Sequence, residues 1–226
     1  MSIRYYQPRR RRRSGKSPRR SALLYFLLAI SLLSQISYPL LDGDVLRMIT
    51  LVSVFSAAVT MLIHSYLSFG GKFALRFFVI TFFYSLIVEV IGTRTGWPFG
   101  NYEYSTTLGV QLFGVPIVVM FAWMMMAYPT LILARRVSRH WTFLIGGYTM
   151  MAWDFFLDPQ MVAAGRWSWD FTGRHVPFQP EIPLSNAFGW LLAGIFIVGL
   201  LNRLLPIERR KEGASLRAVD AILLWT

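Results

Sequence analysis

The stretch EVIGTRTGWPFGNYEY, residues 89–104, decides how this chain folds. It begins with a carboxylate, Glu89, at the end of an apolar run that is long enough to cross a bilayer. The connector that follows is rich in Gly, Pro and aromatic residues, and it cannot continue as an ordinary helix. Irregular backbone is tolerated at membrane depth only where protein or water satisfies its polar groups. We therefore expect a membrane helix that ends in a loop closing the outer end of a cavity.

The composition predicts the same class of protein for the whole chain. Of its 226 residues 55% are hydrophobic and only 15% are charged, and the mean hydropathy is +0.47. With no Cys in the chain, disulfides, thiolate metal sites and thiol nucleophiles are excluded. We predict an all-α fold, a polytopic membrane helical bundle of about six transmembrane helices with aromatic, Gly- and Pro-rich outer loops. The predicted spans are 21–41, 45–69, 73–91, 113–134, 141–162 and 186–205.

The basic residues orient this bundle. Nine of the 23 precede Ser21, directly before an apolar span, which favours a cytoplasmic anchor beside anionic lipid over a nucleic-acid arm. With six spans and the N-terminus inside, 19 basic residues fall on the inner side and only four on the outer side. This asymmetry predicts a multi-pass protein of the plasma membrane with both termini in the cytoplasm. The expected parts are a basic cytoplasmic tail (1–20), a membrane domain (21–205) and a second cytoplasmic tail (206–226).

Three acidic residues stand out because ionisable groups inside a bilayer are costly and mark functional sites. Asp154 and Asp158 are four residues apart, so they share one face of a helix, at a depth similar to Glu89. Carboxyl groups close together outside water do not all ionise, which supplies a general acid and a general base. The alternative is structural: Asp158 caps the helix before Pro159, and Glu89 pairs with Arg94.

A metal site is a weaker interpretation of the same acids. A DxxxD pair can hold Mg²⁺ and a diphosphate, but that chemistry needs a second acidic cluster and basic partners, which the sequence does not show. His64, His140 and His175 are isolated from one another. We therefore expect no metal ion, and no nucleophile motif of the GxSxG kind is present.

The two long outer connectors, about 92–112 and 163–185, are unusually rich in aromatic residues. Aromatic rings at headgroup level form a generic interface belt. That interpretation applies by default to Trp97, Tyr102, Tyr104, Trp167 and Trp169.

Four segments within residues 89–190 resemble a known family. They are EVIGTRTGWPFGNYEYSTTLG, LFGVPIVVMFAW, AWDFFLDPQMVAAGRWSW and IPLSNAFGW. They resemble the carotenoid biosynthesis integral-membrane family that includes the acyclic carotenoid hydratases. The remainder of the chain matches that family only in hydropathy, and the basic tail before Ser21 is not part of its pattern.

The resemblance implies a reaction in which water adds across the terminal double bond of an acyclic carotene end group and leaves a tertiary alcohol. The acids suit it: a protonated carboxyl group donates H⁺ to the alkene, aromatic faces stabilise the cation, and a second carboxylate deprotonates the water. We expect a hydro-lyase without a cofactor. Its partners would be the lipid-soluble carotenoid, membrane lipids and other carotenoid enzymes, with no nucleic acid. The expected catalytic residues are Asp154, Asp158 and Glu89, and the expected substrate-binding residues are Trp97, Tyr102, Trp153, Trp167, Arg94 and Asn186.

Two other functions fit the same residues. A membrane lycopene-type cyclase would make the same cation and close a ring instead of admitting water. A non-enzymatic carotenoid-binding subunit would use the acids only to fix helix packing. The mass of the product separates hydration, which adds water, from cyclisation, which adds nothing, and a binding subunit leaves the pigment unaltered.

Overall fold

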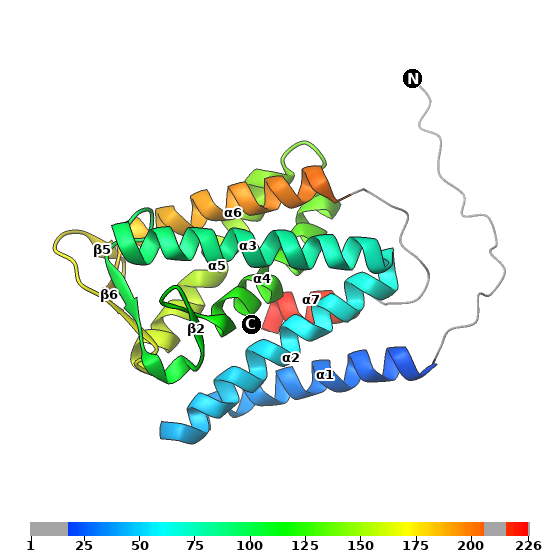
Figure 1. The fold of residues 1–226 in the computed structure, drawn as a ribbon, viewed down its shortest axis with the longest axis horizontal. Helices are drawn as coiled ribbons and strands as arrows, with labels where there is room; N and C mark the ends of the chain where they lie inside the picture. The colour runs from blue at the N-terminus through cyan, green and yellow to red at the C-terminus, as the bar shows by residue number, and fades with distance from the viewer. Residues whose placement is uncertain (1–17, 206–215, 226) are drawn as a thin grey trace.

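The computed structural model describes residues 18–205 and 216–225 of the chain as a bundle of helices with short strands gathered at one end (Figure 1). The first six helices each begin and end within four residues of a predicted span, so the predicted all-α membrane bundle is confirmed. The helices are α1 (Pro18–Ser37), α2 (Gly43–Phe69), α3 (Gly71–Thr95), α4 (Ile117–Val137), α5 (Thr142–Ala163), α6 (Leu184–Leu204) and α7 (Arg217–Trp225), with 3₁₀ turns η1 (Tyr38–Leu40) and η2 (Thr106–Leu108).

Five of the described helices are long and apolar enough to cross a membrane: α1 together with η1, α2, α3, α4 and α6. Although α5 is equally long, it carries two aspartates and is less apolar. It nevertheless packs along α6 over its length. Glycines permit this approach, because a Cβ placed on Gly194 of α6 would lie 3.0 Å from the Cα of Gly147 on α5. The fifth predicted span, 141–162, therefore corresponds to α5 and runs beside α6, which is long and apolar enough to cross a membrane.

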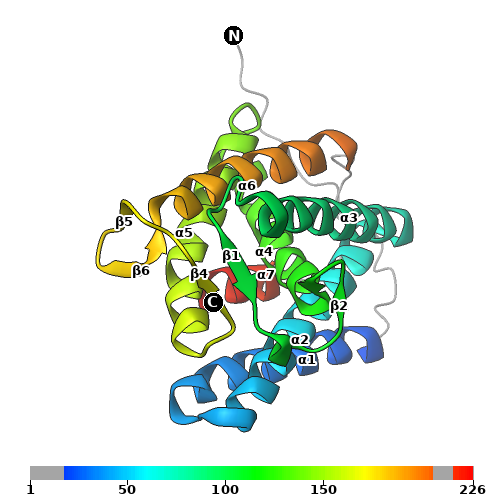
Figure 2. The same cartoon turned by 60° about the vertical axis from the view of Figure 1, so that its left-hand side comes forward.

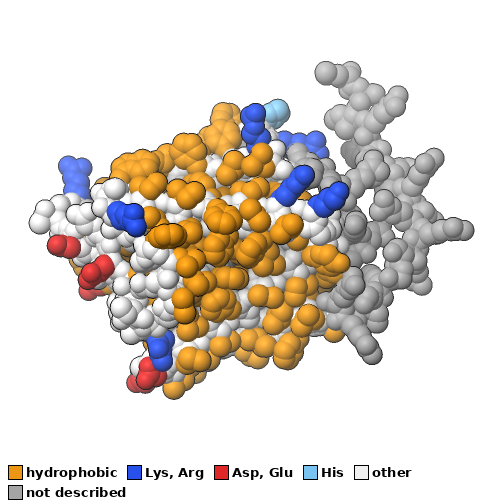
Figure 3. Space-filling model, viewed as in Figure 1, with side chains coloured by type: hydrophobic (Ala, Val, Ile, Leu, Met, Phe, Trp, Pro, Cys, Tyr) orange, Lys and Arg blue, Asp and Glu red, His pale blue; other side chains and the backbone are white. Residues whose placement is uncertain are grey.

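The outside of the bundle is apolar and its centre is filled by α4. Figure 3 shows hydrophobic side chains over the face between the two ends, while the acidic side chains visible on that face lie at the strand-bearing end. Helix α4 packs against α2, α3, α5, α6 and α7. Its side chains Trp123, Met126, Tyr128 and Leu131 are fully buried. An apolar outer surface around a packed central helix is expected when lipid is the solvent.

Short strands build one end of the bundle, where the sequence predicted only irregular outer loops (Figure 2). They form three separate two-stranded antiparallel sheets, β1–β4, β2–β3 and β5–β6. The β1–β4 sheet joins the two long connectors that the sequence singled out. The strands are β1 (Tyr102–Tyr104), β2 (Gln111–Leu112), β3 (Val115–Pro116), β4 (Trp167–Trp169), β5 (His175–Val176) and β6 (Gln179–Pro183).

The structure describes only part of the two predicted tails. Most of the basic tail, residues 1–17, lies outside the described residues, as do 206–215 and 226. Residues 217–225, predicted as part of a tail, form α7, which packs against α4, α1 and α2 (Figure 1). Its Ala218, Val219 and Ile222 are fully buried. Asp220 of α7 also forms an ion pair of 2.6 Å with Arg136 at the end of α4.

Candidate active site

The β1–β4 sheet turns aromatic rings towards the bundle. Tyr102 lies opposite Trp169 and Tyr104 lies opposite Trp167. Because side chains alternate between the two faces of a strand, these four rings share one face, and Glu103 points to the other. The exposure pattern agrees, since the two tyrosines are half-buried and Glu103 between them is exposed. Two connectors that are remote in sequence thus form one aromatic lid.

A cavity lies beneath this lid, with about 740 Å³ of empty space that includes its opening to solvent. All helices from α2 to α6 contribute to its wall. Most of the wall is apolar or aromatic, and a few polar groups converge on it. The polar side chains are Thr50, Glu89, Tyr102, Tyr104, Asp158 and Asn186, and the apolar ones include Phe99, Val118, Trp123, Met126, Leu157 and Trp190.

Glu89 is held by three donors, two from β1 and one from α4. The hydroxyls of Tyr102 and Tyr104 donate to its Oε2 at 2.5 and 2.7 Å, and Nε1 of Trp123 donates to Oε1 at 2.8 Å. Gly92 lies one turn further along α3, and a Cβ there would lie 2.6 Å from the Tyr102 hydroxyl. Only glycine therefore leaves room for the Tyr102 ring beside α3. The Glu89 side chain is only 3% exposed. Its carboxylate is therefore fixed by neutral donors, and most of its lone pairs are occupied.

The two phenols are suited to this role because they stay protonated. Burial raises the pKa of Tyr102, and the neighbouring Glu89 carboxylate raises it further. Burial, and then Glu89, raise the pKa of Tyr104 well above its usual value in the same way. Both hydroxyls thus remain donors at neutral pH.

Asp154 and Asp158 lie on one face of α5, as their spacing predicted, and both are buried. Nδ2 of Asn186 on α6 donates to Oδ2 of Asp154 at 3.0 Å and also to Oδ2 of Asp158. Nε1 of Trp167 donates to Oδ1 of Asp158 at 3.2 Å, whereas Oδ1 of Asp154 is buried without a hydrogen-bond partner among the described residues. Asp158 lines the cavity. It does not cap the helix, because α5 continues through Pro159.

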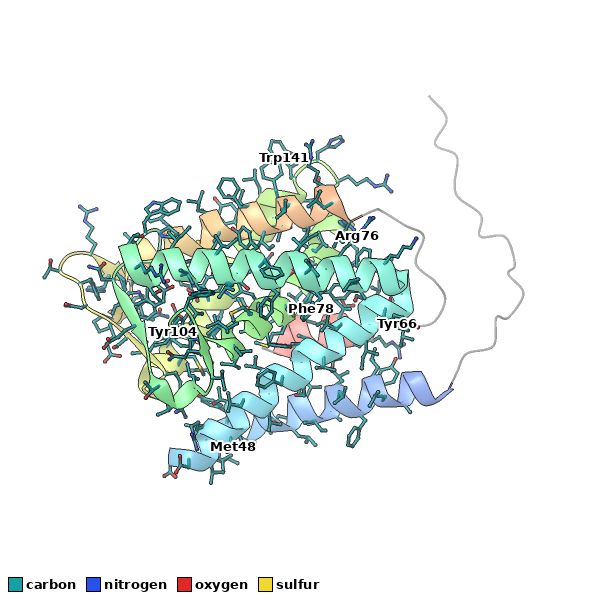
Figure 4. All side chains as sticks on the ribbon, in the orientation of Figure 1. Met48, Tyr66, Arg76, Phe78, Tyr104 and Trp141 are labelled. Carbon is teal, nitrogen blue, oxygen red and sulfur yellow. The ribbon has the colours of Figure 1, made fainter. Side chains whose placement is uncertain are left out.

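The cavity thus carries two separate carboxylate centres, from α3 and from α5, within an aromatic wall. Part of that wall is the stacked pair Trp123 and Trp190, with ring centroids 4.7 Å apart and planes inclined by 21°. Figure 4 shows Tyr104 at the strand-bearing end of the bundle, with Tyr66 and Arg76 at the opposite end. The site therefore occupies the strand-bearing half of the bundle.

Several residues named from the sequence lie elsewhere. Arg94 is exposed and does not pair with Glu89, and Trp97 is 61% exposed. Neither lines the cavity, so the belt interpretation fits Trp97. Trp153 is buried but does not line the cavity either. By contrast, Asn186 contacts both aspartates.

Other cavity residues were not identified from the sequence as part of the site. They are Trp123, Trp190, Phe99 and Tyr104. Trp123 lies in an apolar span, where its indole N–H needs a hydrogen-bond partner. This requirement is the sequence signal that could have linked Trp123 to a buried acidic residue.

The described residues contain no group of three His, Cys, Asp or Glu side chains that could hold a metal ion. His64, isolated in the sequence, is buried in the bundle, where its Nδ1 lies 2.8 Å from the hydroxyl of Tyr128. It does not line the cavity.

Comparison with known proteins gives this site its context. The chain is 35% identical over 127 residues to the bisanhydrobacterioruberin hydratase of Haloarcula japonica. The aligned segment covers 53% of this chain and 41% of that protein. The alignment thus spans less than half the length of the relative. No solved structure matches. The family model for carotenoid biosynthesis protein matches residues 46–226, most of the chain and all of the described cavity. This chain therefore belongs to the carotenoid biosynthesis protein family.

Proposed function

We propose that this protein adds water across the terminal double bond of an acyclic carotene end group, using carboxyl groups as general acid and base. The observation that carries the proposal is the Asp154–Asp158–Asn186 cluster, which presents one carboxyl group to an aromatic cavity. Membership of the family and the similarity to a hydratase support a reaction of this kind.

The acid is Asp158, because it is the aspartate that lines the cavity. It donates a proton to the less substituted carbon of the terminal double bond, and the neighbouring carbon becomes a tertiary cation. Asp154 shares the Nδ2 donor of Asn186 with Asp158, so the two carboxyl groups form a pair that holds the one proton used in catalysis. Trp167 and Asn186 fix the direction in which Asp158 points.

Glu89 stabilises the cation as a fixed negative charge. Its oxygens are occupied by three donors, so it is a poor proton acceptor and a well-oriented countercharge. The faces of Trp123 and Trp190 add the attraction between a cation and an aromatic ring. This role differs from the base or acid expected from the sequence.

Water then attacks the cation, and the carboxylate left on Asp158 after protonation accepts the proton that the water releases. The overall change is alkene plus water to tertiary alcohol, with the acid regenerated. No electron is transferred in this sequence of steps. A cyclase would use the same acid and cation but would lose a proton from the carbon skeleton after ring closure.

We propose a location in the plasma membrane with both termini in the cytoplasm and the strand-bearing end outside. The excess of basic residues on the inner side supports this orientation. A reporter fused after Thr226 should be active only in the cytoplasm. Activity in the outer compartment would contradict an even number of spans.

The reaction is tested by expression in a host that makes lycopene, with mass analysis of the pigments. The product should gain the mass of one or two waters, and the added oxygen should carry label from labelled water. A product of unchanged mass with shorter-wavelength absorption would identify a cyclase, and unaltered bound lycopene would identify a binding protein. Label from O₂ would identify an oxygenase.

A further inference from the structure

The wall of the cavity is incomplete on one side of the bundle. Helix α2 packs against α1, α3 and α4, and α5 packs against α4 and α6, but α2 and α5 do not pack closely against each other in the described chain. Both nevertheless line the cavity, α2 through Thr50 and Val54, and α5 through Leu157 and Met161. The side chains of Val54 and Leu157 are only half-buried. The cavity therefore reaches the gap between these two helices.

Contacts at both ends limit this gap. At the outer end, the hydroxyl of Tyr38 in η1 donates to the carbonyl of Gln160 on α5 at 3.3 Å. On α4, residues Val118 and Arg136 lie on one face, because 18 residues make five helical turns. Val118 lines the cavity, whereas Arg136 holds α7 through Asp220. Helix α7 thus covers the inner half of the α4 face whose outer half is the cavity floor.

We infer that the gap between α2 and α5 is a lateral portal in the plane of the membrane, occupied by the linear polyene of the substrate while its end group lies in the cavity. The identity of this ligand rests on the proposed function. The portal itself is defined by the helices and by the contacts at its two ends.

The chemistry of the surroundings favours this occupant. A carotene is apolar along its length and dissolves among lipid chains, so a sideways entrance avoids passage through water. The cavity behind the portal is lined in part by Met125 and Met126 of α4, whose flexible side chains adapt to an elongated ligand. Because α7 covers the inner half of the face, the chain leaves sideways into the lipid and does not continue through the bundle.

The test is binding of lycopene to purified, detergent-solubilised protein, measured as quenching of tryptophan fluorescence, which does not depend on catalysis. V54F/L157F narrows the portal from both sides. L75F/V79F makes the same two exchanges on the exposed face of α3 and is the matched control. The portal predicts at least about tenfold weaker binding for V54F/L157F and unchanged binding for the control. Unchanged binding in V54F/L157F would overturn the inference.

A second variant closes the portal only after the protein has folded. The chain has no Cys, so V54C/L157C can be bridged selectively by a bifunctional thiol reagent with a reducible spacer. Bridging should abolish lycopene binding, and reduction of the spacer should restore it. Full binding by the bridged protein would show that the ligand enters elsewhere. Normal binding and portal dependence without any hydrated product would retain the portal and reject the hydratase.

Discussion

Trp123 donates its indole N–H to Glu89 across 2.8 Å and so links the central helix α4 to α3 inside the cavity. This contact joins the stability of the bundle to the electrostatics of the site. A buried carboxylate retains its charge at low cost only while its donors are in place.

Trp123→Phe should therefore reduce the free energy of unfolding by about 1.5–3 kcal/mol, the usual range for a hydrogen bond to a charged group. Denaturation of the purified protein, followed by circular dichroism, measures this change. Trp141→Phe is the matched control, since Trp141 is 59% exposed and should cost less than about 0.5 kcal/mol. Equal losses in the two variants would show that the contact with Glu89 has no special weight.

Asp158→Asn and Asp154→Asn should each lower the hydration rate by about 10²–10⁴-fold, because the amide keeps the hydrogen bonds of packing but transfers no proton. The double variant should be no worse than Asp158→Asn, since the pair acts as a unit. Product formation in membranes is measured at matched protein levels. Glu103→Gln, on the outer face of β1, should retain activity. Wild-type pigment from both aspartate variants would remove them from the mechanism.

Gly147→Ala should destabilise the bundle by about 1–3 kcal/mol, the range for overpacking in a filled core. The new Cβ would lie 2.5 Å from Cγ1 of Ile195 and 2.9 Å from the carbonyl oxygen of Leu191. Gly199→Ala is the control on the same interface: its Cβ would lie at an ordinary 3.5 Å from Phe143, so helix propensity should make it neutral or stabilising. Thermal unfolding in detergent compares the two. A stable Gly147→Ala protein would mean that α5 and α6 are less closely packed.

The phenols of Tyr102 and Tyr104 should not ionise as pH rises to about 10, the ordinary tyrosine pKa, because burial raises both pKa values. A raised folded-state pKa favours the protonated form, so their contribution to stability is complete below the unfolded-state pKa and falls as pH rises above it. Tyrosinate absorbance compares wild type with Y102F/Y104F. Up to that pH the two titrations should coincide, and a smaller step in the variant would contradict the burial of these rings.

The sequence predicts the helices of this fold well, because long apolar runs between basic connectors are decided by the bilayer and not by particular contacts. The sequence also singles out Glu89, Asp154 and Asp158 as candidate site residues, since acidic residues within apolar spans are rare. The partners of these acids depend on tertiary structure. Trp123 is 34 residues from Glu89, and Asn186 is 28 residues from Asp158, and no local pattern encodes either pair.

The outer connectors show the opposite behaviour. From aromatic composition alone, Tyr102, Trp167 and Trp97 are all interpreted as members of an interface belt. In the structure Tyr102 and Trp167 line the cavity, whereas Trp97 is exposed. What distinguishes them is strand pairing between segments more than 60 residues apart, which sequence alone does not specify. The packing of α7 against α4 was missed for a similar reason, because nine residues are too few to predict a packed helix.

The pairing of β1 with β4 also constrains how this protein can change over generations. A substitution at Glu103 or Ser168 changes the face of the sheet that points away from the cavity and leaves the strand register unchanged. Loss or gain of a single codon just before β1 is different: it shifts the strand by one place and exchanges inner for outer side chains throughout. Tyr102 and Tyr104 would then leave Glu89 together. Among natural variants, length changes in these connectors should therefore be absent next to the paired strands and confined to the bends farther away.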